Sequence, residues 1–183
     1  MGCRSFVVKQ ITTIMAQELD LSKFTEFKLR VNIKTTIENA YRAWASPAGI
    51  GSWFFRIVYK DKNGNIRSAE ELAQEGDEYT LSLNTKPDVM ILQGKVLKAN
   101  GRDLFSFTFS KGVPVTISIY TEQDETIVQL VESHLPTDEE TIRKHFVGDT
   151  KGWIFYLTNL KSIMEGGLDL RNKNAAITNV ITH

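Results

Sequence analysis

A single amphipathic segment near the C-terminal end constrains this chain more than any other feature. Large apolar side chains recur there at offsets of 0, 3, 4, 7, 10 and 11 residues: Trp153, Tyr156, Leu157, Leu160, Ile163 and Met164. This spacing places them on one broad stripe of a helix. The pair Gly166–Gly167 that follows is typical of a helix C-terminus. The segment therefore predicts a long helix whose stripe is buried against another layer.

Most of the chain before this helix shows the period-two alternation of strands. At 24–34, apolar Phe27 and Leu29 alternate with charged Lys28 and Arg30, so one face is expected to be buried and the other wet. Further strands are expected at 55–59, 66–69, 79–83, 89–98, 104–109, 113–120 and 126–134. The turn signals between them are Asn63-Gly64, Asn100-Gly101, Lys111-Gly112 and Gln123-Asp124. Short turns between successive strands predict an antiparallel meander.

Two short helices are expected directly after the first strand. Thr35 and Glu38 have the spacing of a capping box, which predicts a helix start at this point. Pro47 ends this helix, because proline clashes with the preceding turn. A second short helix or turn is expected over 48–54.

A further helix is expected before the final one. Thr137 and Glu140 form a second capping box, which predicts a helix to about residue 146. Gly148 and the following aspartate are expected to break or bend it. Asp149 or Thr150 would then cap the last helix.

Each layer must cover its apolar face, and this requirement selects the fold class. We expect an α+β domain in which a curved antiparallel sheet of about six to seven strands wraps around the long C-terminal helix. The two short helices after the first strand plug one end. The domain is expected to span 24–171, between a poorly anchored extension at 1–23 and a polar tail at 172–183. We hypothesise that Met15, rather than Met1, is the true initiator. The intact mass of the native protein would show which of the two is used.

Charge and cysteine usage limit the function classes. Lys plus Arg equals Asp plus Glu at 22 each, so binding of nucleic acid through a basic surface is not expected. Cys3 is the only cysteine and rules out a disulfide framework, which fits a reducing cytoplasm. No apolar run has the length of a membrane span. A net charge of zero leaves a homodimer open.

The order of elements resembles the START-like (SRPBCC) superfamily with its helix-grip fold. Within it, the chain is similar to the family named for the C-terminal domain of the activator of heat-shock-protein-90 ATPase. The matching positions are Trp44, Pro47, Trp53, Phe54, Gly152, Trp153, Tyr156, Leu157 and Leu160. The resemblance covers about 24–171 and implies either a cavity for a small apolar ligand or a chaperone partner.

The aromatic residues suggest where a ligand would lie. Six residues would form the walls between sheet and helix: Trp53, Phe107, Phe109, Trp153, Tyr156 and Leu160. They allow two interpretations, an apolar pocket oriented by the Tyr156 hydroxyl or a core filled by the rings themselves. The sequence leaves both open.

Catalytic and metal motifs give little support to an enzyme. The histidines are His134, His145 and His183, and none has the spacing of a metal site. No catalytic residue and no cofactor is assigned, although Arg56, Glu78 or His134 could provide acid–base chemistry at the sheet rim in a cyclase- or hydrolase-like enzyme. The acidic run at 70–78 is interpreted as a solvated loop. Ligand binding ranks first, a chaperone interaction second and an enzyme third.

Overall fold

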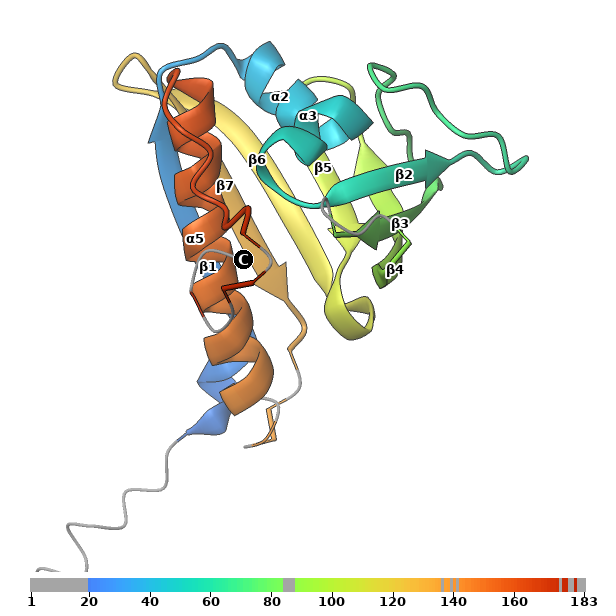
Figure 1. Ribbon diagram of the computed structural model, residues 1–183. Helices are drawn as coiled ribbons and strands as arrows, with labels where there is room; N and C mark the ends of the chain where they lie inside the picture. Colours follow the sequence, from blue (N-terminus) through green and yellow to red (C-terminus); the bar gives the residue numbers. More distant parts are fainter. Residues whose placement is uncertain are drawn as a thin grey trace, which may run out of the picture.

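The computed structural model describes residues 20–83, 88–135, 137–138, 140, 142–174, 176–177 and 180. The candidate initiator Met15, Cys3 and His183 lie outside the described residues. A seven-stranded antiparallel sheet with the order β1-β7-β6-β5-β4-β3-β2 curves around one side of a long helix, α5 (Val147–Met164) (Figure 1). Helices α2 (Ile37–Ala45) and α3 (Pro47–Trp53) cover one end of it. The expected α+β fold class is confirmed.

The sheet is built almost entirely from neighbours in sequence. Its strands are β1 (Glu26–Ile33), β2 (Arg56–Lys60), β3 (Glu78–Ser82), β4 (Met90–Ala99), β5 (Leu104–Thr108), β6 (Pro114–Glu122) and β7 (Glu125–Ser133). Only β1 pairs with a distant strand, with Leu29 opposite Leu130 and Phe27 opposite Glu132. The β6–β7 turn has positive φ at both Gln123 and Asp124, 48° and 63°, as a tight two-residue hairpin requires.

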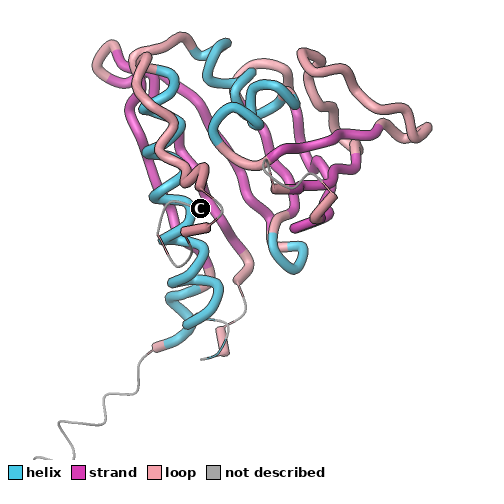
Figure 2. The backbone as a smooth tube through the Cα atoms, viewed as in Figure 1, coloured by secondary structure: helices cyan, strands magenta, loops and turns pink. Residues whose placement is uncertain are grey.

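Alternation along the strands decides which side chains reach the core. In β1, Phe27 and Ile33 are buried while Lys28 and Arg30 are exposed. The buried stripe of α5, which includes Trp153, Tyr156, Leu157 and Leu160, lies in the same core as the inward residues of the sheet. The tube in Figure 2 shows how the strands curl beside this helix.

Two local expectations are corrected by tertiary contacts. Helix α2 is capped by Thr36, whose Oγ1 accepts from the Asn39 N–H at 3.1 Å. The predicted cap Thr35 instead supplies a backbone carbonyl to the Thr126 hydroxyl, at 2.6 Å. The predicted strand at 66–69 is also wrong, because only Ile66 makes an isolated bridge, and β2 pairs with β3.

The predicted break at Gly148 does not occur. A π-helical turn, η3 (Ile142–Phe146), runs directly into α5, and Thr150 donates its hydroxyl to the Phe146 carbonyl inside this continuous helix. The Phe146 ring packs edge-on against Phe24 and Phe27, with centroids 5.0 and 5.6 Å away. This anchoring to β1 outweighs the cost of a glycine within a helix, about 1 kcal/mol. The capping box predicted at Thr137 falls in a stretch that is only partly described.

Candidate functional site

A cluster of aromatic rings fills the space between the sheet and α5, with Trp153 at its centre. Its ring stacks on Phe54 at 5.2 Å between centroids. Phe109 lies 5.0 Å away, Trp44 6.0 Å and Phe107 6.5 Å. Aromatic pairs at such separations stabilise each other beyond their buried area.

The predicted wall residues all reach this interior, at different depths. Trp53, Phe107, Trp153, Tyr156 and Leu160 are buried. Phe109, which follows β5, is half-buried and is the outermost of the six.

Glu132 is a buried carboxyl within this cluster, and it is absent from the predicted site. Its side chain is 0% exposed, and Oε2 accepts a hydrogen bond from the Trp153 indole N–H at 2.8 Å. The signal was present in the sequence, because Glu132 is in phase with the inward residues Val128 and Leu130 of β7. Alternation therefore points a carboxyl toward the helix.

The environment of Glu132 favours its protonated form. Burial raises the pKa of this carboxyl to about 8, although the Trp153 hydrogen bond opposes the shift. The nearby Asp149 carboxyl on α5 raises the pKa further, because two negative charges repel and because a protonated Glu132 can donate a hydrogen bond to Asp149. At neutral pH the Glu132 side chain is therefore largely uncharged.

One buried polar group in this interior lacks a hydrogen bond. Within the described part of the chain, the Trp44 indole N–H has no acceptor, and its ring lies beside Trp153. Glu132 Oε1 accepts from no donor, but the Asp149 carboxyl lies within hydrogen-bond reach and a protonated Glu132 donates to it. Buried polar groups are normally satisfied, so the Trp44 N–H needs an explanation such as a bound molecule.

The acid–base candidates from the sequence lie elsewhere. Arg56, Glu78 and His134 are all exposed. The acidic run is a loop as expected, but Asp77 within it is buried and forms an ion pair with Arg67. The interpretation of Asp77 as solvated is therefore wrong, because a cation ten residues earlier folds over it.

Comparisons with known proteins identify similar folds. No model of a known protein family matches the chain, and no curated protein matches it. Protein SSP2350 from Staphylococcus saprophyticus has a similar structure, with a TM-score of 0.63 and 20% identity over 80% of this chain and 96% of that chain. The Aha1 dimer from Colwellia psychrerythraea gives 0.57 and 18% over 78% and 97%. CalU16 from Micromonospora echinospora gives 0.54 and 17% over 78% and 76%.

These likenesses bear on the fold alone. The chain shares the sheet-and-helix architecture of these proteins over most of its length. Among the described residues, no helix combines the length and apolar character needed to cross a membrane.

Proposed function

We propose that this START-like domain binds a small, largely apolar molecule between the sheet and α5. The observation that carries the proposal is a pair of buried polar groups among the aromatic rings: the Glu132 carboxyl with its raised pKa, and the Trp44 indole N–H, which lacks a partner. An apolar site with a few convergent polar groups and a perturbed pKa is typical of ligand binding.

The state of Glu132 restricts the chemistry of the ligand. A protonated Glu132, whose Oε2 accepts from Trp153, has one proton to donate, and a ligand oxygen would compete for it with Asp149. The indole N–H of Trp44 is a second donor. The best complement is an uncharged molecule with a hydroxyl or carbonyl oxygen. An anionic ligand would lose its hydration among the rings and would find no counterion beside Glu132 and Asp149.

Native mass spectrometry of protein purified from its own cells is the first test. We expect a bound species that dissociates on denaturation. In a second test, 2-naphthol should shift the Trp153 indole N–H resonance saturably and bind more tightly than naphthalene, which has the same rings without the hydroxyl.

The variant Glu132→Leu provides the control for this preference. It keeps an apolar filling side chain and removes the polar group, so 2-naphthol and naphthalene should then bind alike. An empty native species, with no thermal shift from lipids and aromatic metabolites, would contradict the proposal. Ordered water would then be the partner of the buried Trp44 indole N–H.

A chaperone interaction is the second candidate. It comes from the family resemblance of the sequence, and the fold shared with the Aha1 structure from Colwellia is compatible with that resemblance. This function requires a cytoplasmic protein. The cytoplasmic location stays a prediction, and so does a homodimer. A pull-down with the host chaperone, followed by its ATPase assay, tests this function, and unchanged turnover would remove it.

A cyclase- or hydrolase-like enzyme is the third candidate. It needs a polar residue with a perturbed pKa among the apolar walls, and Glu132 satisfies this condition. In such an enzyme Glu132 would act as the general acid. Glu132→Gln should then abolish turnover without abolishing substrate binding.

A further inference from the structure

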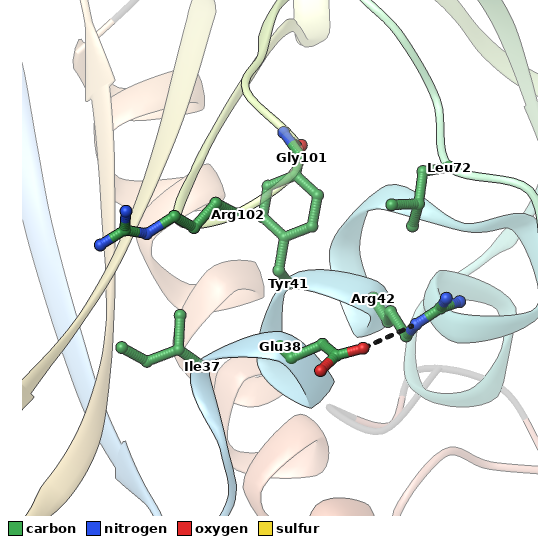
Figure 3. A pocket seen from close by; sticks show the side chains of 7 residues that line it. All are labelled: Ile37, Glu38, Tyr41, Arg42, Leu72, Gly101 and Arg102. Carbon is green, nitrogen blue, oxygen red and sulfur yellow. Dashed lines mark hydrogen bonds and ion pairs between the residues drawn. The ribbon is translucent and has the colours of Figure 1, made fainter.

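A pocket separate from the ring cluster opens on the surface where α2 meets the turn between β4 and β5 (Figure 3). Its volume is about 380 Å³, within the range of small-molecule sites. The lining residues are Ile37, Glu38, Tyr41, Arg42, Leu72, Gly101 and Arg102. None of them belongs to the ring cluster around Trp153.

The floor of this pocket is apolar and held in place. Tyr41 is 1% exposed, and its ring packs edge-on against Phe105 at 6.2 Å. Its hydroxyl oxygen accepts from the Gly101 N–H at 3.0 Å. Ile37 and Leu72 contribute half-buried aliphatic surface on either side. The floor therefore fits a flat or aliphatic body rather than a fully hydrated ion.

Two arginines border the pocket in loose ion pairs. Arg42 Nε lies 3.8 Å from Glu38 Oε1, and its Nη1 reaches the Glu70 carbonyl at 3.4 Å. Arg102 Nε lies 3.3 Å from the adjacent Asp103 carboxylate, with 83% of its side chain exposed. Exposed pairs with long separations are weak, so a ligand can replace them.

We propose that this pocket binds a small organic carboxylate. Its apolar body would lie against Ile37 and Leu72, and its charge would be held by Arg42 and Arg102 in place of Glu38 and Asp103. Guanidinium groups recognise carboxylates through paired hydrogen bonds. Glu38 and Asp103 balance the two arginines, so the rim has no excess charge, and their carboxylates repel a doubly charged phosphate more than a monoanion. The site is independent of the proposed function, because its ligand would not touch the rings under α5.

The test is an amide NMR titration of the full chain with benzoate and with benzamide, its uncharged analogue. We expect a saturable shift of the Gly101 resonance with benzoate and at least about tenfold weaker binding of benzamide. The double variant R42Q/R102Q should weaken the binding of benzoate about tenfold. Glu38→Gln should strengthen it about twofold, since it removes a repelling charge.

Arg30→Gln is the matched control, because Arg30 is an exposed arginine on β1 whose partner is Glu122. It should leave benzoate binding unchanged. Equal binding of benzamide, no saturable shift at Gly101, or equal affinity of R42Q/R102Q and Arg30→Gln would overturn the proposal. Tighter binding of inorganic phosphate than of benzoate would also overturn it. A shift of the Trp153 indole instead would place the ligand under α5.

Discussion

Individual residues show where sequence reasoning reaches its limit. Alternation in β7 places Glu132 on the buried face with Leu130, so its direction could be predicted. Its protonation could not, because this depends on burial and on Asp149 from a distant helix. The burial of Asp77 likewise depends on Arg67, which the chain folds back onto it. Charge partners of this kind are set by the fold, and no local pattern encodes them.

The stability of the protein should depend on pH through Glu132. Its pKa in the folded state is about 8, raised from an ordinary value of 4.5, so folding strengthens proton binding. The contribution to stability is complete below about pH 4.5 and is lost as the pH rises toward 8. The free energy of unfolding should fall by up to about 1.4 kcal/mol per pH unit in this window.

Denaturant unfolding of wild type and Glu132→Gln across this pH range measures the effect. Glutamine stays neutral and can still accept from Trp153, so the variant should lose the slope. Glu75→Gln, at an exposed carboxyl, serves as the control and should keep it. Parallel curves for wild type and Glu132→Gln would show that Glu132 does not hold its proton in the folded state.

At the scale of elements, periodicity predicted which segments form helices and strands. Tertiary contacts determined where these elements begin and end. The first strand, the helix pair and α5 were all expected from spacing, as was the closing glycine pair, in which Gly166 has a φ of 80°. The errors occur where a distant group decides. By sequence alone Thr35 and Thr36 are equivalent cap candidates. In the structure the Thr126 hydroxyl binds the Thr35 carbonyl, and Thr36 caps the helix. Gly148 is a plausible helix end by sequence, but the packing of Phe146 on β1 holds the helix continuous through it.

Gly94 in β4 is required by a neighbouring strand. Tyr79 of β3 lies across it and donates its hydroxyl to the Thr108 carbonyl on β5. A Cβ at Gly94 would lie 2.5 Å from the Tyr79 hydroxyl and 2.6 Å from that carbonyl. Gly94→Ala should therefore destabilise the domain by about 1–3 kcal/mol, through displacement of Tyr79.

Gly51→Ala in α3 is the matched control for this substitution. A Cβ there meets nothing within 4 Å, and alanine favours a helix by about 0.5–1 kcal/mol. Chemical denaturation should move the two variants in opposite directions. A neutral Gly94→Ala would mean that Tyr79 does not lie across the strand.

At the scale of the whole molecule, the segment after α5 folds back onto the end of α3, a contact that sequence patterns do not predict. Residues 168–171 return beside the helix, and the Arg171 guanidinium donates to backbone carbonyls of Gly51, Ser52 and Phe54 at the end of α3. Asp169 pairs with the same guanidinium. The repeating apolar patterns predict sheet and helix, whereas this contact joins polar groups distant in sequence.

Asn159 links this segment to the core. It is 0% exposed, its Nδ2 donates to the Trp53 carbonyl at 2.7 Å, and its Oδ1 accepts from the Leu170 N–H at 2.8 Å. Removal of residues 168–171 would leave this buried oxygen without its partner. Such a loss costs about 1–3 kcal/mol, to which the Arg171 hydrogen bonds add.

Two truncations can therefore locate the end of the folded unit. A chain ending at residue 171 should unfold at the same denaturant concentration as the full chain, because the domain is proposed to span 24–171. A chain ending at residue 167 should lose about 2–4 kcal/mol. Arg171→Lys in the full chain should show part of that loss, since an ammonium cannot span three carbonyls while pairing with Asp169. Equal stability of the two truncated chains would contradict a structural role for this segment and move the domain boundary back to α5.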